Sequence, residues 1–366
     1  MKVLHVEGGR NLYGGARQVL YLLEGLERRG IDNVLVCPAG SELAREGAAH
    51  AEVHAISMAG DLDFRLIGRL YRIIRRVRPD LVHLHSRIGA DVMGGIAARL
   101  AGVPVVHSRR QDNPEMRWAV AVKYRLHDRV VAISEGIGHV LASEGMPASK
   151  LRCVRSAIDP APFRRPGNRP WFLAEFGLPE DCIAIGVIAQ LIERKGHRFL
   201  LEALPELVGR YPGLHVLLFG KGPMESSLIE IVRRRGLTDR VHFPGFRDDL
   251  PRILPCLDLV VHPALREGLG ISLLQSAAAG VPIVASRVGG IPEAVRDGEN
   301  GLLVPPGDAV ALAAAIHRLL DDPELARGMG KRGQALIDRE FSVEGMIEGN
   351  LAVYRELLAE KRIPLS

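Results

Sequence analysis

The sequence predicts an α/β protein with two doubly wound domains, each built on a parallel β-sheet. Short apolar runs of β-forming residues alternate with longer helical patterns, which is typical of repeated β-α-β units. These elements fall into two series, and a proline-rich segment without periodicity separates the series. A chain of 366 residues is long enough for two such domains.

The first series of predicted strands lies in the N-terminal half of the chain. Its apolar runs are residues 3–7, 34–37, 81–85, 104–107 and 129–133. Helical patterns occupy the intervening segments 15–29, 64–77 and 90–101. Strands that alternate with helices pair in parallel, so we expect one parallel sheet from this half.

The second series repeats the architecture without repeating the sequence. Its predicted strands are residues 183–188, 214–219, 240–243, 257–261 and 282–285. A last helical segment, residues 341–361, has its apolar positions at Met346, Leu351, Tyr354, Leu357 and Leu358. We therefore expect a second sheet of the same kind, followed by a C-terminal helix.

Residues 159–170 mark the expected boundary between the domains. They contain four prolines, and proline stops both helices and sheets. We interpret this segment as a linker that can act as a hinge. The predicted domains are residues 1–165 and 171–345, followed by a terminal helix at 346–366.

Composition limits the class of protein. Hydrophobic residues make up 47% of the chain and charged residues 25%, as in ordinary globular proteins. Four cysteines lack the paired spacing of a zinc site and indicate a reducing compartment. The N-terminus reads as a strand rather than a signal sequence, and no apolar run is long enough to span a membrane. We therefore expect a cytoplasmic protein.

The net charge of +5 is divided unevenly along the chain. Residues 1–170 carry 26 Lys and Arg against 17 Asp and Glu, whereas residues 171–366 carry 22 against 26. A basic first half suits a phosphorylated acceptor or anionic lipid head groups. The alternative is an arginine-rich protein with ordinary solvated surfaces.

The most informative stretch is residues 262–293. Two glycine-bearing turns, at 268–270 and 289–290, each open directly into a helical segment. The first N–H groups of a helix have no intrahelical partners, so anions bind there. Glu267 stands beside the first turn. A phosphate site next to a carboxylate suits a sugar nucleotide, which presents a diphosphate and hydroxyl groups.

This stretch resembles the donor-binding motif of the retaining GT-B glycosyltransferases of family 4. The family pattern is Glu-Gly-hydrophobic-Gly, four further residues and a second Glu, followed by Ala-x-Gly-x-Pro-Val-Val-Ala. Residues 267–270 match the first part and residues 278–285 match the last. Gln275 stands where the family usually carries its second Glu. The resemblance extends along nearly the whole chain.

The resemblance implies a fold and a reaction. The fold is GT-B, two Rossmann-like domains that face each other across a cleft, with a final helix that returns to the first domain. The reaction moves a sugar from a nucleotide-diphosphate sugar with retention of configuration, without an obligatory metal and without a cofactor besides the donor. The second domain binds the donor and the first binds the acceptor.

A second motif supports the donor site. Lys195 and Gly196 follow a predicted strand, at the sheet edge where open α/β sheets bind ligands. They match the family's Lys-Gly pair, but Gln190 stands where the family has Arg, which weakens the positive charge of the site unless Arg194 or another cation compensates. An exposed basic loop is the alternative interpretation.

The donor-binding candidates come from these turns and from the resemblance. Lys195 and the backbone of residues 268–271 would bind the diphosphate, and Glu267 would hold sugar hydroxyls. An amide both donates and accepts, so Gln275 can reach the ribose. The full set is Gly14, Gly15, Gln190, Arg194, Lys195, Gly220, Lys221, Phe246, Glu267, Gly268, Leu269, Gly270, Ile271 and Gln275. A plain tight turn would explain Gly14 and Gly15 equally well, and Arg17 replaces the family's common Glu two residues further on.

The first domain supplies the acceptor candidates His85, Arg109 and Arg110. Arg110 stands where the family often has a histidine, and arginine can bind a phosphate through two hydrogen bonds. We therefore name Arg110 with Glu267 and Lys195 as catalytic candidates. A salt-bridged pair of arginines is the alternative. His83 and His85 share one strand face, but the sequence offers no third ligand, so we expect no metal site.

The segment 64–78 predicts a basic amphipathic helix. Arg65, Arg69, Arg72 and Arg76 lie on one side, and apolar residues lie on another. Such a helix either covers a sheet with a solvated outer face or lies on an anionic membrane.

The function expected from all of this is a retaining glycosyltransferase of bacterial lipopolysaccharide or cell-surface polysaccharide synthesis. Its partners would be a nucleotide sugar, a glycan or anionic glycolipid acceptor and the inner face of the membrane, with no nucleic acid. Two alternatives stay open because Gln190, Gln275 and Arg110 depart from the family pattern. They are a sugar-nucleotide-binding protein without activity and a sugar-nucleotide epimerase.

Overall fold

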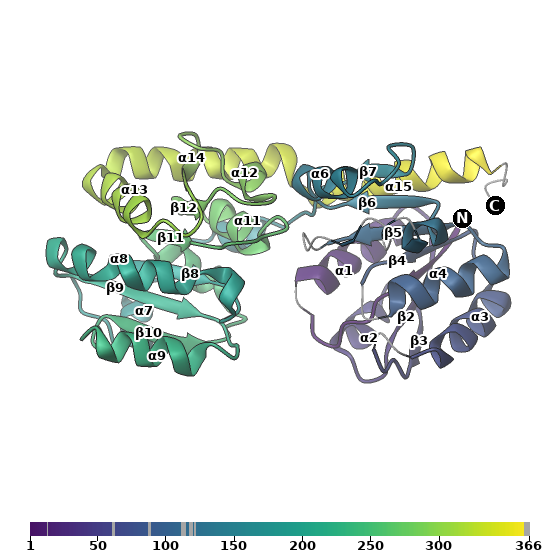
Figure 1. Cartoon of the computed structure of the whole chain (residues 1–366), viewed down its shortest axis with the longest axis horizontal. Helices are drawn as coiled ribbons and strands as arrows, with labels where there is room; N and C mark the ends of the chain where they lie inside the picture. Colours follow the sequence, from purple (N-terminus) through teal and green to yellow (C-terminus); the bar gives the residue numbers. More distant parts are fainter. Residues whose placement is uncertain are drawn as a thin grey trace. The chain divides into compact units, whose positions relative to one another are not determined.

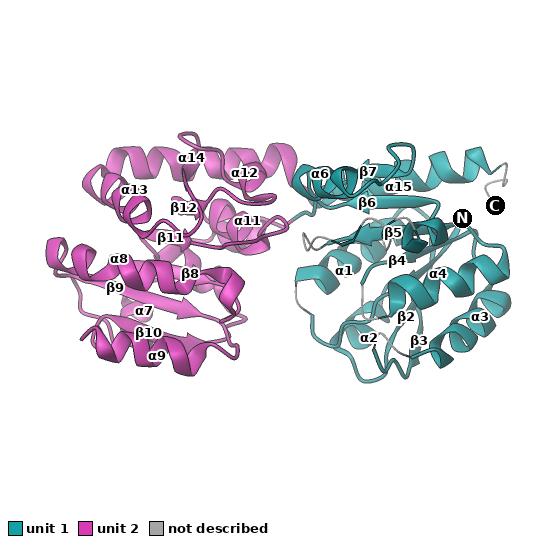
Figure 2. Ribbon diagram, viewed as in Figure 1, with its two compact units in different colours: residues 1–157, 343–366 teal, residues 158–342 magenta. Residues whose placement is uncertain are grey.

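The structure is a computed structural model that describes residues 1–361 except 13, 61–62, 87–88, 111–114, 117–119 and 121. The chain forms two compact units (Figure 2). Unit 1 consists of Met1–Ala157 together with the chain from Val343 onward, and unit 2 is Ile158–Ser342. The sequence places these divisions at residues 165 and 346, a few residues later in each case.

Unit 1 is built on a seven-stranded parallel sheet (Figure 1). The strand order is β3-β2-β1-β4-β5-β6-β7. Its strands are β1 (Lys2–Val6), β2 (Asp32–Pro38), β3 (Glu52–Ile56), β4 (Leu81–Leu84), β5 (Val105–Arg109), β6 (Arg129–Ala132) and β7 (Leu151–Cys153). The helices are α1 (Gly14–Glu27), α2 (Glu42–Gly47), α3 (Arg65–Val77), α4 (Ala90–Ala101), α6 (Glu135–Ser143) and α15 (Val343–Glu360), with a 3₁₀ turn at Tyr124–Leu126.

The C-terminal helix α15 completes the core of unit 1. Leu351, Tyr354 and Leu357 are buried in a cluster that also contains Leu22 and Leu26 of α1. Gly25 permits this packing, because a Cβ atom there would lie 2.1 Å from Cδ1 of Ile347. Four glutamates of α15 also join unit 1, which then carries 26 basic and 20 acidic residues. The charge difference between the units is therefore smaller than the difference between the halves of the sequence.

Unit 2 contains a six-stranded parallel sheet in the order β10-β9-β8-β11-β12-β13. Its strands are β8 (Ile183–Ile188), β9 (Leu214–Phe219), β10 (Val241–Gly245), β11 (Leu259–His262), β12 (Ile283–Ser286) and β13 (Gly301–Val304). The helices are α7 (Arg169–Phe176), α8 (His197–Arg210), α9 (Glu225–Arg234), α10 (Leu250–Ile253), α11 (Ile271–Ala278), α12 (Ile291–Ala294), α13 (Ala309–Asp321) and α14 (Pro323–Glu340). Three 3₁₀ turns lie at Ala161–Arg164, Glu193–Lys195 and Leu254–Cys256.

Both sheets have helices on their two faces, which explains why their strands are apolar almost throughout. All six residues of β9 are buried, for example. The sheet of unit 2 separates two hydrophobic clusters, one on each face.

The proline-rich segment is not the linker that the sequence predicts. Phe163 in this segment is buried in the core of unit 2, beside Phe172 of α7. Gly167 packs against the backbone of Pro255, where a Cβ atom would lie 2.7 Å from the carbonyl oxygen. The prediction was wrong because prolines break periodicity without preventing one aromatic side chain from anchoring the segment.

The chain passes between the units twice, after Ala157 and after Ser342. At these points Ile158 pairs with Ser342 in an isolated bridge, and the Ile158 N–H donates to the Phe341 carbonyl at 3.0 Å. Gln18 of α1 holds Ala157 through two hydrogen bonds, of 2.7 and 2.8 Å. Phe341 and Ser342 belong to this crossing, so the helix predicted at 341–361 begins at Val343.

Two predictions from composition concern cysteines and membrane spans. All four cysteines are free thiols, and three of them are buried. Within the described residues, no helix is both long and apolar enough to cross a membrane.

Candidate functional site

The sheet of unit 2 reverses its direction of growth between β8 and β11. From β8 the chain adds β9 and β10 on one side, and it then returns to add β11, β12 and β13 on the other. Ligands in open α/β sheets bind at the carboxyl ends of the strands at such a switch point. The loops that follow β8 and β11 are those that carry Lys195 and Glu267.

These two side chains meet at the switch point. The Lys195 ammonium donates a short hydrogen bond to Oε2 of Glu267, and His262 Nε2 lies 2.9 Å from the same oxygen. The other carboxylate oxygen accepts the Gly268 N–H at 3.1 Å. All three side chains are largely buried, so the carboxylate is held in one orientation.

The electrostatics of this network keep Glu267 ionised. Burial alone would raise the pKa of Glu267, but the hydrogen bond from His262 and the charge of Lys195 outweigh it, so its pKa is far below normal. Burial lowers the pKa of His262, which therefore donates as a neutral imidazole. An ammonium has three donors, so Lys195 keeps donors for a phosphate while it binds Glu267.

Two further cations border this network. Arg194 is partly exposed and Lys221, after β9, is exposed. Within the described residues, neither side chain has a hydrogen-bond or ion-pair partner. Gln190 is also exposed at this edge. Arg194 and Lys221 are therefore two cations at this edge whose side chains are available to an anion.

Gly196 fixes the distance between the two loops. Its φ is +67°, and a Cβ atom would lie 1.9 Å from the Pro263 carbonyl oxygen. The neighbouring Arg194 carbonyl accepts the Leu265 N–H at 2.8 Å. Only glycine fits a backbone that is both left-handed and in contact with another strand of the chain.

Substitution of Gly196 by Ala should therefore destabilise unit 2 by about 3 kcal/mol or more and abolish ligand binding at this edge. Gly236 is the matched control, because it has the same φ of +67° and no atom lies within 4 Å of the place its Cβ would occupy. Gly236→Ala should cost only about 1 kcal/mol, the strain of a left-handed residue. Urea unfolding of the two variants measures the difference, and equal costs would contradict this account.

The turn before α11 provides backbone donors next to Glu267. Gly270 has a φ of +87° and begins α11, whose first residue is Ile271. Leu269 is buried in the core and anchors the turn. Gln275 lies one turn further along α11 and is partly exposed. The Glu267 carbonyl also accepts the Gly290 N–H at 3.2 Å, which joins the second glycine turn to the first.

The loops after β9 and β10 complete this edge. Gly220 has a φ of +149°, and a Cβ atom there would lie 2.0 Å from the Ala189 carbonyl oxygen. The Gly220 N–H donates to the Gly245 carbonyl at 2.8 Å, so the loops after three adjacent strands are joined. Phe246 is 53% exposed and presents its aromatic ring beside them.

Unit 1 has its own switch point, between β1 and β4. Glu7 follows β1, and His85 and Ser86 follow β4. The Gly8 N–H donates to Ser86 Oγ at 2.6 Å, and the Gly9 N–H donates to Glu7 at 2.9 Å. Burial raises the pKa of Glu7, although the charge of Arg110 opposes that shift.

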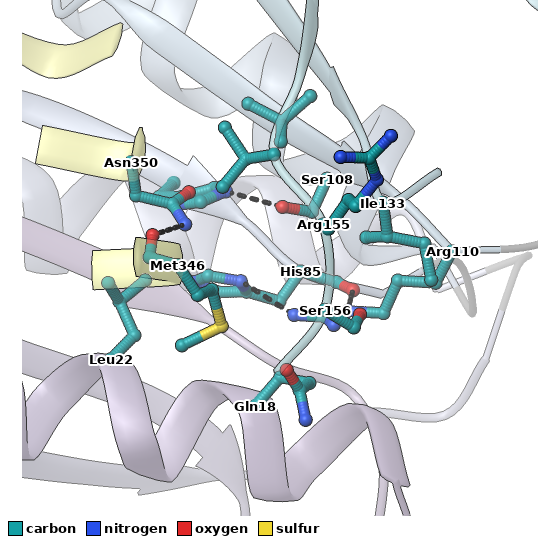
Figure 3. Close-up of a pocket in the computed structure, with 13 residues that line it drawn as sticks. Gln18, Leu22, His85, Ser108, Arg110, Ile133, Arg155, Ser156, Met346 and Asn350 are labelled. Carbon is teal, nitrogen blue, oxygen red and sulfur yellow. Dashed lines mark hydrogen bonds between the residues drawn. The ribbon is translucent and has the colours of Figure 1, made fainter. Parts of the chain in front are cut away.

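Arg110 reaches this edge from the end of β5. Its Nε donates to the His85 carbonyl at 3.2 Å, and its Cδ lies 3.5 Å from where a Cβ of Gly15 would stand. Gly14 begins α1 beside it. Figure 3 shows Arg110 on one side of a small pocket and Asn350 and Met346 on the other, with His85 between them. The volume of about 10 Å³ is too small for a sugar.

Arg109 does not accompany Arg110. Its side chain is 1% exposed and donates to Glu115 at 2.8 Å. Lys123 joins the same network through Glu115 and Asp91. Adjacent residues of an extended chain point to opposite sides, so Arg109 and Arg110 enter different networks. The structure thus favours the salt-bridged interpretation for Arg109, and Gln111 and Asp112 of the same motif lie outside the described residues.

Three buried histidines form a cluster beneath the unit 1 edge. His5 of β1 joins His83 and His85, and one nitrogen of each lies within 4.8 Å of the others. Both His83 nitrogens already have partners, the Tyr354 hydroxyl and Ser108 Oγ, and His5 lies 3.0 Å from His85. A metal ion would have to break these hydrogen bonds. These hydrogen bonds explain why three histidines can be buried together in the interior of unit 1.

Sequence reasoning placed Ser86 with His85 at a strand end that lines the site, but it gave no role at these edges to Glu7 or His262. Each follows or ends a strand on one side of a switch point, and that position is the signal that could have identified them. The strand order was needed first, because it decides which strand ends are neighbours.

Comparisons with known proteins agree with this geometry. Family models described as "Glycosyltransferase Family 4" and "Glycosyl transferases group 1" match residues 13–162 and 181–322. The chain is 31% identical over 317 residues to a 2-deoxystreptamine glucosyltransferase of Streptomyces kanamyceticus. The aligned region covers 80% of this chain and 81% of that protein. It is also 29% identical over 374 residues to the lipopolysaccharide core biosynthesis glycosyltransferase LpsE of Rhizobium meliloti. That aligned region covers 99% of this chain and 100% of LpsE.

Solved structures show the same fold. Anabaena HepE in complex with UDP has a TM-score of 0.85 at 21% identity and covers 97% of this chain and 100% of that one. The fold and its two switch-point edges therefore define a two-domain α/β protein of the GT-B type. The chain belongs to the group 1 glycosyltransferases of family 4.

Proposed function

We propose that this glycosyltransferase moves a sugar, with retention of configuration and without a metal ion, from a nucleotide-diphosphate sugar to a glycan or anionic glycolipid. The observation that carries the proposal is the Lys195–Glu267–His262 network at the switch point of unit 2. The solved structures of HepE contain UDP and UDP-glucose, which supports a donor of this chemical class.

In the proposed donor complex, the diphosphate lies against Lys195, Arg194 and the N–H groups of residues 268–271. Cations and oriented backbone dipoles stabilise the charge that develops as the sugar–phosphate bond breaks. Glu267 accepts hydrogen bonds from the sugar hydroxyls. Phe246 stacks on the nucleobase, and Gln275 binds the ribose.

The proposed transfer needs no dedicated base. The bond between the anomeric carbon and the phosphate oxygen breaks, and the acceptor oxygen bonds to that carbon on the same face of the sugar. The acceptor proton goes to the departing diphosphate. Lys195 and Arg194 make that diphosphate a stable leaving group, so no cofactor enters the reaction.

The acceptor is proposed to bind at the edge of unit 1, where Arg110, Glu7 and Ser86 converge. Arg110 provides the charge for a phosphorylated acceptor, in the place where a histidine is common in the family. The similarity to LpsE, a lipopolysaccharide core enzyme, supports an acceptor of this kind. Peripheral binding at the inner face of the membrane would bring the enzyme to such a glycolipid.

A thermal unfolding panel with UDP-, GDP- and ADP-sugars tests the donor. A ligand at 100 times its Kd should raise Tm by about 5–10 °C for a unit of this size. The Glu267→Gln variant should lose most of that shift. No shift with any nucleotide sugar would contradict the proposal. A shift without transfer would indicate a binding protein instead of an enzyme.

A further inference from the structure

The outer face of helix α3 is not explained by the packing of unit 1. The inner face buries Leu66, Leu70 and Ile74 against the sheet of unit 1 and helix α4 (Figure 1). This packing accounts for the apolar half of the helix. It does not account for the composition of the other half.

The charged residues of the outer face are all positive. Residues 64–78 contain six arginines and no acidic residue. Within the described residues, Arg69 is paired with Asp63, whereas Arg65, Arg72, Arg75, Arg76 and Arg78 have no ion-pair partner. A solvated helix usually mixes charges of both signs, which lowers self-repulsion.

Two aromatic side chains lie in the middle of this charge. Phe64 is 67% exposed and Tyr71 is 37% exposed, and both are exposed large hydrophobics. At 100° per residue, Phe64, Tyr71 and Arg75 share one stripe, with Arg65, Arg72 and Arg76 along its side. Leaving a phenylalanine ring in water is unfavourable unless something covers it.

We propose that this face of α3 docks onto an anionic phospholipid surface. Arginine guanidinium groups pair with lipid phosphates, and aromatic rings enter the interface at the level of the head groups. The arrangement fits a helix that lies along the membrane plane, with the arginines flanking an aromatic stripe. The inference rests on the membrane contact in the proposed function, which it assigns to α3, and it does not depend on the donor or on the transfer step.

A nucleic acid could also bind the arginines of this face through its phosphates. Such binding would not explain two aromatic side chains along one helix. The single-stranded nucleic acid sites that use aromatic rings stack bases in a groove lined by several elements. Phe64 and Tyr71 are instead exposed on a single element, helix α3 and its N-cap. The observations therefore favour a lipid surface.

The test is co-sedimentation with vesicles of 30% phosphatidylglycerol in phosphatidylcholine, compared with pure phosphatidylcholine. Each basic residue near an anionic surface changes partitioning about fivefold. The triple variant Arg72→Gln/Arg75→Gln/Arg76→Gln should therefore bind about 100-fold less, and Phe64→Ala should bind several-fold less. In 0.5 M NaCl, screening should weaken binding of the wild-type protein.

A matched control removes three exposed arginines from unit 2 through Arg233→Gln/Arg234→Gln/Arg327→Gln. This control should bind the anionic vesicles as the wild-type protein does. Equal losses in both triple variants, or equal binding to the neutral vesicles, would overturn the proposal. Tighter binding to a 30-nucleotide RNA that survives Phe64→Ala would also overturn it. The donor-induced Tm shift should be unchanged in the α3 variants, which separates this inference from the proposed function.

Discussion

Replacement of Glu267 by Gln should lower kcat/KM for sugar transfer about 100- to 1,000-fold. Glu267 is ionised and holds Lys195 and His262 in fixed positions, so the neutral amide would lose both the charge and the orientation of these donors. The substitution keeps the size and an acceptor oxygen. The measurement is steady-state transfer with the donor identified by thermal unfolding.

The alanine variant would confuse this measurement. Glu267→Ala leaves the largely buried Lys195 ammonium with no acceptor at this position, whereas Gln keeps an acceptor oxygen, and removing one side of a buried pair costs about 3–5 kcal/mol. Lys195→Met/Glu267→Gln removes both charges and provides the stability control. Turnover of Glu267→Gln at the wild-type rate would contradict the assigned role.

Acidification from pH 7 to pH 5 should destabilise unit 1 by about 4 kcal/mol or more. Burial lowers the pKa of His5 to about 3 and that of His127 to about 4, well below the unfolded value of 6.5. In this window the unfolded chain binds protons that the folded chain does not, so stability falls as pH falls. Each of the two histidines contributes about 2 kcal/mol between pH 7 and pH 5.

His83, His85 and His107 also have pKa values lowered by burial and act in the same direction, whereas the carboxylates act outside this window or in the opposite direction. Carboxylates with a lowered pKa, such as Asp128, lose their contribution only as pH falls below about 4.5. Glu7 has a raised pKa, so its protonation partly opposes the loss. Urea unfolding at pH 7.5, 6 and 5 measures the effect, and NMR should show the two imidazoles neutral at pH 5. A free energy of unfolding that stays constant across this range would contradict the prediction.

Most strands were predictable from the sequence because buried parallel strands are apolar throughout. The predicted runs at 183–188 and 214–219 coincide with β8 and β9. Three strands, β3, β7 and β13, were missed. The edge strand β3 has the sequence Glu-Val-His-Ala-Ile, with polar residues at its first and third positions and no fully buried side chain, so it lacks the apolar signal.

The site was predictable as a set of residues but not as a network. Glycine turns before helices identified the loops that carry Lys195 and Glu267. The ion pair joins residues 72 positions apart, and only the strand order shows that their loops are adjacent. The partners of Arg109 and Arg110 could not be predicted, because Glu115, which pairs with Arg109, and His85, whose carbonyl binds Arg110, lie on other segments of the chain.

The most direct test of the donor site is amide hydrogen exchange with and without the nucleotide sugar that raises Tm. We predict slower exchange at residues 191–196 and 268–271, where Lys195, Glu267 and the first turn of α11 would bind the diphosphate. Unchanged exchange at both segments, with protection elsewhere in the chain, would contradict the account.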